Sequence, residues 1–290
     1  MFQNTPPGFQ LFLEWLREIT NNPWVCLEAT GYYSEALAEF MCKQQIKVSI
    51  INPMRIKNFA KAILARNKND PLDSRTILQY ARVSTDLREY KPRPQAEKAL
   101  KEIVKLIDLL TSQQSQLKNQ LETIQSKLVK VELTRAIKVI HLRIERLEKQ
   151  LRVLIEQDDH LKVRKNQYKS IQGVGEKTAY RLLAHLPDLS LYQSAKQLAA
   201  YAGLSPRQCQ SGAYIGITKL SKFGSIQLRN CLYMSAVVAK NHNPHFREFC
   251  LRLEKNGLKP KQIVCAIMRK LLHVIFGMHK SGQVFDPKLV

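Results

Sequence analysis

Three acidic residues in the N-terminal part of the chain have the types and spacing of a metal site. Glu28 directly follows the apolar run Trp24–Leu27, at the carboxyl end of an expected strand, where open α/β sheets build their sites. Asp70 and Asp73 are three residues apart, so they face the same way at the start of a helix. Three converging carboxylates could hold Mg²⁺ against phosphodiester oxygens. The alternative is structural, with Glu28 a surface acid and Asp70 a helix cap.

A glycine-rich segment, residues 170–179 (Ser-Ile-Gln-Gly-Val-Gly-Glu-Lys-Thr-Ala), is typical of the turn in a helix-hairpin-helix element. Gly173 and Gly175 would let backbone N–H groups at a helix start approach a DNA phosphate, with Lys177 beside them. Such contacts bind DNA without reading its sequence. An ordinary turn between two packed helices has the same pattern, so both interpretations stay open.

A third segment, residues 203–229, combines serines, glycines and cations between apolar helices. Ser211 could act as a nucleophile, and nearby cations could stabilise a pentavalent phosphate. No His or Asp lies at a sequence spacing typical of a catalytic partner for either serine. Spacing alone therefore favours Ser211 and Ser221 as helix caps. The cations expected to contact nucleic acid here are Arg207, Lys219, Lys222 and Arg229.

The charge of the chain favours a polyanionic partner. Its 290 residues include 46 Lys and Arg against 24 Asp and Glu, which gives a net charge of +22 and a pI near 9.8. Fourteen of those cations, but only three acids, lie in residues 201–290. Such self-repulsion is usually tolerated where the partner is nucleic acid, and it weighs against an enzyme of small neutral metabolites. We therefore expect DNA binding that depends strongly on salt.

The sequence carries no sign of export or of a membrane span. It has no run of about 18 apolar residues, and residues 1–5 lack the basic and apolar regions of a signal peptide. The cysteines, at positions 26, 42, 209, 231, 250 and 265, form no CxxC pair. Scattered cysteines of this kind indicate reduced core residues of a cytosolic protein. Because the sequence has no apolar span, we expect no membrane partner.

The elements that must position these residues begin with an α/β region. Trp24–Leu27 and Lys47–Ile51 fit buried strands, and residues 34–45 between them carry apolar residues at helical spacing. Strand, helix and strand within about 28 residues form a βαβ unit, so the two strands should be parallel. A further helix should begin just after Asp70 and run to about Val83.

After a proline-rich linker at 90–94, the pattern becomes that of long helices. Apolar residues step by three and four through 100–131, interrupted only at Gln114, and a second seam runs through 140–161. The two helices could pair as an antiparallel hairpin within the chain or between subunits. The rest of the chain is helical and basic. We therefore expect an α/β domain at 1–90, a coiled coil at 95–165 and a mainly α-helical domain at 166–290.

Six short blocks occur in a fixed order along nearly the whole chain. They are 26–33 (Cys-Leu-Glu-Ala-Thr-Gly-Tyr-Tyr), 51–53 (Ile-Asn-Pro), 68–73 (Lys-Asn-Asp-Pro-Leu-Asp), 173–178 (Gly-Val-Gly-Glu-Lys-Thr), 202–206 (Ala-Gly-Leu-Ser-Pro) and 210–212 (Gln-Ser-Gly). Any one block is a weak signal, but their order and spacing make the match specific. In these blocks the chain resembles the transposases of the insertion-sequence 110/1111 group, which include pilin-gene-inverting recombinases.

The resemblance implies a fold, an activity and partners. The fold is a RuvC-like (RNase H-type) α/β domain, long coiled-coil helices and a mainly α C-terminal domain. The activity is that of a prokaryotic, nucleoid-associated DNA transposase or site-specific recombinase. In it, Glu28, Asp70 and Asp73 are the second to fourth members of a DEDD set that binds Mg²⁺, and Ser211 attacks a DNA phosphodiester. The implied partners are double-stranded DNA at element ends and target, a guide (bridge) RNA, and further copies of the chain in a dimer or tetramer.

One departure from the family pattern affects catalysis. The family's first Asp lies on an opening strand that precedes the segment matching residues 1–4, so we expect this chain to lack that strand and that Asp. Three functions then remain: a recombinase, a catalytically inactive truncated copy that only binds nucleic acid, and a metal-dependent junction nuclease without serine chemistry. A covalent protein–DNA adduct would distinguish the first function from the other two.

Overall fold

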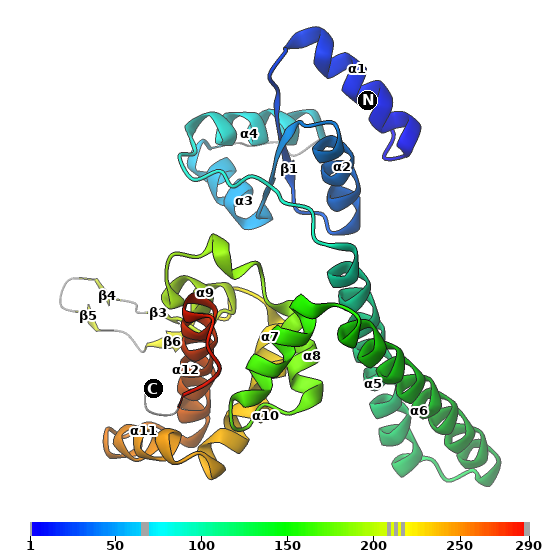
Figure 1. The fold of residues 1–290 in the computed structure, drawn as a ribbon, viewed down its shortest axis with the longest axis vertical. Coiled ribbons are helices and arrows are strands. Elements are labelled where there is room, and N and C mark those ends of the chain that lie inside the picture. Colours follow the sequence, from blue (N-terminus) through cyan, green and yellow to red (C-terminus); the bar gives the residue numbers. More distant parts are fainter. Residues whose placement is uncertain (1, 65–69, 208–209, 212–213, 216–217, 287–290) are drawn as a thin grey trace. The chain divides into compact units, whose positions relative to one another are not determined.

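The computed structural model describes residues 2–64, 70–207, 210–211, 214–215 and 218–286 (Figure 1). The chain divides into two compact units, Met1–Arg93 and Pro94–Val290, with the boundary in the proline-rich segment. The N-terminal unit contains α1 (Pro6–Ile19), β1 (Trp24–Glu28), α2 (Tyr32–Lys43), β2 (Lys47–Ile51), α3 (Pro53–Ala62) and α4 (Asp70–Val83).

The C-terminal unit is mainly helical. In chain order it contains α5 (Gln95–Thr123), α6 (Lys127–Glu156), α7 (Asp159–Ser170), α8 (Glu176–His185), the short 3₁₀ helix η1 (Leu189–Leu191), α9 (Ala195–Tyr201), β3 (Pro206–Arg207), β4 (Gln210–Ser211), β5 (Tyr214–Ile215), β6 (Lys219–Leu220), α10 (Ile226–His242), α11 (Pro244–Lys255) and α12 (Pro260–Ser281). The prediction of a helical C-terminal part is confirmed.

The N-terminal unit contains the predicted parallel βαβ unit. β1 and β2 pair in parallel, with Trp24 opposite Lys47 and Glu28 opposite Ile51, and α2 connects them. Apolar side chains from α1, α2 and both strands form a small core of Leu13, Val25, Ala38, Met41, Ile46 and Val48. Among the described residues this sheet has two strands. The RuvC-like identity of the domain goes beyond two parallel strands and stays a prediction.

Capping residues set where the helices around this sheet begin. Asn52 accepts a hydrogen bond from the Met54 N–H (2.8 Å), and Pro53 follows at the first helical position of α3.

Ser49 lies buried on β2, receives a hydrogen bond from the Trp24 indole N–H (2.9 Å) and donates one to the Arg88 carbonyl (2.8 Å). These contacts hold the segment after α4 against the outer edge of β2.

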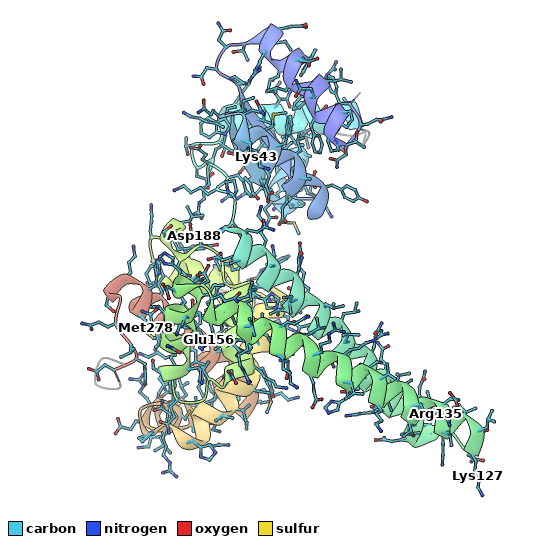
Figure 2. The ribbon with its side chains drawn as sticks, turned by 45° about the vertical axis from the view of Figure 1, so that its right-hand side comes forward. Lys43, Lys127, Arg135, Glu156, Asp188 and Met278 are labelled. Atoms are coloured by element: carbon cyan, nitrogen blue, oxygen red, sulfur yellow. The ribbon has the colours of Figure 1, made fainter. Side chains whose placement is uncertain are left out.

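α5 and α6 pack against each other as a hairpin that extends from the rest of the C-terminal unit, so pairing within the chain is observed (Figure 1). Figure 2 shows Lys127 and Arg135 near its far end and Glu156 where α6 reaches the helical core. The near half has buried seam residues, among them Val104 and Leu151, whereas seam residues toward the far end are only half-buried. The hairpin is therefore anchored at one end.

The first apolar seam was predicted to run too far. α5 ends at Thr123, and Ile124 adopts an extended backbone (φ −74°, ψ 137°) that stops the helix. Leu128 and Val131 consequently lie on α6, with 77% and 49% of their surface exposed. The three-and-four spacing continues by chance across the turn, because apolar spacing alone does not show where a chain reverses direction.

The core of the C-terminal unit is built around α8, α10 and α12, which contribute fully buried residues such as Leu182, Leu232 and Leu271. Among the described residues, α12 is long and apolar enough to cross a membrane, with a mean hydropathy of 1.2 and half of that stretch buried inside the unit. Core helices pass the same criterion, and the packing of α12 is that of a core helix. The described cysteines are free thiols, and Cys209 lies outside the described residues.

Candidate functional site

Glu28 is the last residue of β1, as the sequence predicts. The turn that follows is fixed by Ser34, which accepts a hydrogen bond from the Thr30 N–H (3.2 Å) and donates one to the Gly31 carbonyl (2.9 Å). Gly31 has φ +70°, a conformation that favours glycine. The Glu28 carboxylate is half-buried and has no hydrogen-bond or ion-pair partner among the described residues. It is therefore available to a ligand.

A cavity of about 380 Å³ opens beside Glu28, between the start of α1, the end of β1 and α2. Its lining is mostly apolar and includes Phe9, Phe12 and Leu37. Such a lining offers few partners for phosphate oxygens, so the cavity does not by itself define a substrate site. Glu28 is the one ionised side chain among the described residues of this lining, whose other polar residues are Gln3, Asn4, Thr30, Tyr33 and Ser34.

Asp70 and Asp73 lie on the first turn of α4, which begins at Asp70 itself. α4 contacts β1, the strand that ends in Glu28, so the two candidate elements pack together within the N-terminal unit. Asp73 is half-buried, and the side chain of Asp70 lies outside the described side chains. Among the side chains that the structure describes, no three His, Cys, Asp or Glu gather closely enough to hold a metal ion. The convergence of all three carboxylates therefore stays a prediction.

Ser211 lies on a β-hairpin, where the sequence pattern indicated only a loop (Figure 1). β3 pairs with β6 and β4 with β5, both antiparallel, so that Ser211 lies directly opposite Tyr214. Only positions 212 and 213 separate these two residues in the chain, which places Ser211 at the far end of the hairpin. The backbone pairing is described, whereas the Ser211 side chain lies outside the described side chains.

Two cations face each other on this hairpin. Arg207 and Lys219 are direct cross-strand partners on β3 and β6, and both are exposed. Neither has an ion-pair partner among the residues that the structure describes. Side chains directly opposite on paired strands lie about 5 Å apart at Cβ, and like charges in that position destabilise the pair. An anion bound between them would remove this repulsion, as a phosphate would.

The base of the hairpin is held by close backbone packing. A Cβ added at Gly224 (φ +143°) would lie 2.2 Å from the Tyr201 carbonyl oxygen, and one at Gly203 (φ +71°) would lie 2.9 Å from the Phe223 carbonyl oxygen. The half-buried Arg229 Nη1 donates to the carbonyl oxygens of Ala202 (2.8 Å) and Gly224 (3.4 Å). Arg229 therefore positions the hairpin, which is a structural role beside the nucleic-acid contact predicted for it.

Two serines follow the hairpin, and Ser221, which was predicted to cap a helix, does not do so. Ser221 Oγ accepts a hydrogen bond from the Phe223 N–H (3.2 Å) and caps a turn. Ser225 Oγ accepts from the Leu228 N–H (3.2 Å) and is the N-cap of α10. Lys222, between the turn and the helix, is exposed and has a positive φ of +55°. The helix-capping role predicted for Ser221 thus belongs to Ser225.

The glycine-rich segment forms the turn between α7 and α8. Gly173 has φ +101°, and an added Cβ would lie 2.9 Å from the Ser235 carbonyl oxygen on α10, so packing within the core demands glycine there. Gly175 is exposed, with nothing within 4 Å of an added Cβ, and is the N-cap of α8. Lys177 is exposed and forms an ion pair with Glu148 of α6 (2.6 Å). Of the two glycines, Gly175 is the one that faces solvent.

A charged network that the sequence did not predict joins α5 to α8. The Asp108 carboxylate accepts hydrogen bonds from Arg181 (2.8 Å) and lies 3.4 Å from Nε2 of His185. Burial by itself raises the pKa of Asp108, but the hydrogen bond with His185 and the charge of Arg181 outweigh it, so the pKa lies below its ordinary value. No spacing rule links residues 73 positions apart, which is why the network could not be found from the sequence.

Comparisons with known proteins assign the class. Residues 166–251 match the transposase family described as IS116/IS110/IS902, and residues 1–128 match a family described as a transposase, of the DEDD type of IS110. The chain is 34% identical to the pilin gene-inverting protein of Moraxella bovis over 303 aligned residues, which cover 99% of this chain and 90% of that protein.

Two further relatives carry insertion-element names. The transposase for insertion sequence element IS1328 of Yersinia enterocolitica is 24% identical over 273 residues, which cover 83% of this chain and 79% of that protein. An insertion element IS110 protein of Streptomyces coelicolor is 28% identical over 157 residues, which cover 54% of this chain and 38% of that protein. The chain belongs to the IS116/IS110/IS902 family of insertion-sequence transposases, and its function is that of a DNA transposase or recombinase.

Proposed function

We propose that this protein cuts and rejoins DNA with Ser211 as the nucleophile and with Glu28, Asp70 and Asp73 as carboxylates that hold a divalent cation, Mg²⁺. The observation that carries the proposal is the serine hairpin. Arg207 and Lys219, which have no ion-pair partner among the described residues, lie opposite each other on β3 and β6, and Ser211 ends β4, four positions after Arg207. In a DNA transposase, two facing cations are a candidate site for a phosphate, and we propose that Ser211, on the next strand of the same segment, supplies the hydroxyl that attacks it.

The proposed reaction forms one phosphorus–oxygen bond for each one that it breaks. Ser211 Oγ attacks the phosphorus of a phosphodiester, an Oγ–P bond forms, and the bond from phosphorus to one deoxyribose oxygen breaks. The serine proton leaves to solvent and the departing oxygen takes up a proton. Attack by another deoxyribose hydroxyl on the phosphoserine then rejoins the strand and restores the serine. Arg207 and Lys219 stabilise the negative charge that grows on the phosphate oxygens.

The carboxylates suit a hard divalent cation. Glu28 offers oxygen donors that have no competing partner among the described residues, and Asp73 lies on a helix that contacts the strand of Glu28. A cation bound there would neutralise charge on a phosphodiester oxygen. In this family the site joins the carboxylates of one subunit to the serine of another, so the proposal includes a dimer or tetramer. The RuvC-like fold, the coiled-coil role of α5 and α6 and a guide RNA are further parts of the proposal that rest on the resemblance.

A second function competes with this one: DNA binding without catalysis. The observation that favours it is the excess of fourteen Lys and Arg over three acids in residues 201–290, which is enough for DNA binding by itself. DNA binding alone would require the cations of the C-terminal unit but neither Ser211 nor Glu28. The two functions therefore predict the same affinity for DNA, and they differ in whether a DNA strand is cut and joined to the protein.

Trapping of a covalent adduct separates them. The protein is incubated with Mg²⁺ and a nicked DNA substrate whose cleaved end diffuses away, and the products are separated under denaturing conditions. The proposed chemistry predicts that any protein–DNA adduct depends on Ser211 and is lost in Ser211→Ala at equal DNA affinity, because a hydroxyl contributes little to a charge-driven interface. Ser221→Ala is the matched control and should retain the adduct. Tight DNA binding without any adduct would leave the binding function alone.

A further inference from the structure

The two helices of the α5–α6 hairpin differ in charge. α5 contains four Lys and four acids, so its charges balance, whereas α6 contains eight Lys and Arg against four acids. Each acid of α6 contacts a cation or a histidine within its own unit: Glu132 with Arg135, Glu145 with His141, Glu148 with Lys177, and Glu156 with Lys162 and Lys165. The acids of α6 are thus already engaged, and the excess positive charge belongs to other residues of the helix.

Part of that excess lies on the face of α6 opposite the seam with α5. Lys138, Arg146 and Lys149 are exposed and have no ion-pair partner among the described residues. At 100° per residue they fall within one outward-facing stripe, about half a turn away from seam residues such as Ile144 and Leu151. From Lys138 to Lys149 the helix rises about 16 Å, the length of about five base-pair steps in duplex DNA.

The stripe continues into the α7–α8 turn. Arg152, one turn beyond Lys149, forms an ion pair with Glu176 (3.2 Å), and Glu148 forms one with Lys177 (2.6 Å). These contacts hold the exposed turn at Gly175 directly against the near end of α6. One surface of the C-terminal unit therefore joins the cations of α6 to the helix start that the sequence predicts as a phosphate contact.

We propose that the outward face of α6, with Lys138, Arg146 and Lys149 as its contacts, binds the phosphate backbone of duplex DNA and extends the contact made at the α7–α8 turn. This inference rests on the proposed function for its partner, DNA. It adds a surface on the helical arm, where the charge would draw the duplex along the helix without reading its sequence.

A second copy of the chain fits this face less well. Exposed apolar residues, among them Val139 and Leu142, do lie beside the cations. However, two copies that met through this same face would bring Lys138, Arg146 and Lys149 against their own counterparts, and Glu145, the acid beside them, offers a single negative charge that already contacts His141 (3.5 Å). A polyanion instead gains from every one of these charges.

The test compares two matched lysine pairs on the full chain. Lys138 and Lys149 on α6 are replaced by Gln, and in the control Lys105 and Lys118, exposed on α5, are replaced in the same way. Both variants lose the same charge, and circular dichroism checks that both remain folded. Fluorescence anisotropy with duplex DNA over a range of salt gives the slope of log Kd against log salt. We expect the α6 pair to lower that slope by about 2 and the α5 pair to leave it nearly unchanged.

Three outcomes would contradict the assignment or what it rests on. Equal slopes for the two variants would overturn the α6 surface while leaving DNA binding by the chain intact. A near-zero slope for the unmodified protein would contradict the proposed function itself. Sedimentation without DNA provides the third: if the α6 pair alone changes the association state, the face is a subunit contact and not a DNA surface.

Discussion

The two units place their candidate residues in different structural settings. In the N-terminal unit, Glu28 lies at the end of a strand that also contributes to the small core, and Asp73 lies on a helix that contacts that strand. In the C-terminal unit, Ser211 lies on a hairpin whose described side chains are exposed, apart from Leu220. Substitutions at the candidate residues of the N-terminal unit are therefore expected to affect both catalysis and folding stability. In the C-terminal unit, substitution of Ser211 should affect catalysis without affecting stability.

A second difference concerns charge. The described acids proposed for catalysis lie in the N-terminal unit, whereas the exposed cations Arg207, Lys219, Lys138 and Lys149 lie in the C-terminal unit. DNA affinity should therefore follow the C-terminal unit, and bond cleavage should need both. Variants that change one property without the other test this division directly.

The largest expected effect is on cleavage, from Glu28→Gln. Removal of one negative oxygen donor should lower the rate of adduct formation by about 100-fold or more and leave DNA affinity nearly unchanged, because Glu28 adds no attraction to a phosphate. Adduct yield over time and anisotropy measure the two quantities. Glu18→Gln, an exposed acid of the same unit, is the control and should alter neither. Normal cleavage by Glu28→Gln would remove the carboxylate from the mechanism.

The next effect is on stability and compares glycines of the two units. Gly173→Ala combines a positive φ with a Cβ 2.9 Å from the Ser235 carbonyl oxygen, so it should cost about 3 kcal/mol. Gly31→Ala has a positive φ but open space and should cost about 1 kcal/mol. Gly175→Ala, at φ −78° in open space, should change stability by less than about 0.5 kcal/mol.

The two tryptophans make these effects separable by unit. Trp15 and Trp24 both lie in the N-terminal unit, so tryptophan fluorescence follows that unit, and circular dichroism follows mainly the helical C-terminal unit. In urea, Gly173→Ala should shift the circular dichroism transition and Gly31→Ala the fluorescence transition. A common shift of both signals by either variant would show that the two units unfold together.

A further effect on stability concerns a carboxylate ion pair in each unit. Asp108→Asn should cost about 2 kcal/mol because it breaks a half-buried network with Arg181 and His185. Asp86→Asn removes a pair with Arg55 in which both side chains are more than half exposed, and it should cost about 0.5 kcal/mol. Added salt should weaken only the Asp86 pair appreciably. Equal losses of unfolding free energy in the two variants would mean that burial does not make the Asp108 pair stronger than the Asp86 pair.

The pKa shift of Asp108 gives this comparison a pH dependence. Because its pKa is lower in the folded protein than in the unfolded chain, the network stabilises the fold fully above about pH 4. The contribution is lost as the pH falls through the lower, folded-state pKa. Unfolding by urea at a series of pH values should therefore show the difference between wild type and Asp108→Asn shrinking in acid. A constant difference down to low pH would contradict this assignment.

Local pattern predicted much of the fold. The parallel βαβ unit and the position of Glu28 followed from two apolar runs and the short connection between them. The start of α4 at Asp70 followed from an Asp-Pro pair. The two long helices followed from three-and-four spacing, but the turn after Thr123 did not, since that spacing happens to continue through it.

The parts that could not be predicted depend on contacts distant in sequence. The cross-strand pair of Arg207 and Lys219 needs a hairpin whose strands are only two residues long, too short to leave an alternating pattern. The role of Gly173 depends on α10, more than sixty residues away, and that of Asp108 on α8. The assignment of Ser211 as nucleophile came from the resemblance to a family, and the backbone position of Ser211 at the end of a hairpin is compatible with it.

The most direct test of the central claim is to locate the covalent bond. Adducts formed with the nicked DNA substrate are digested with protease and nuclease, and the modified peptide is sequenced by mass spectrometry. The proposed mechanism predicts a nucleotide linked through phosphate to the hydroxyl of Ser211, and no modified peptide from Ser211→Ala. A nucleotide on any other residue, or an undiminished adduct from Ser211→Ala, would contradict it.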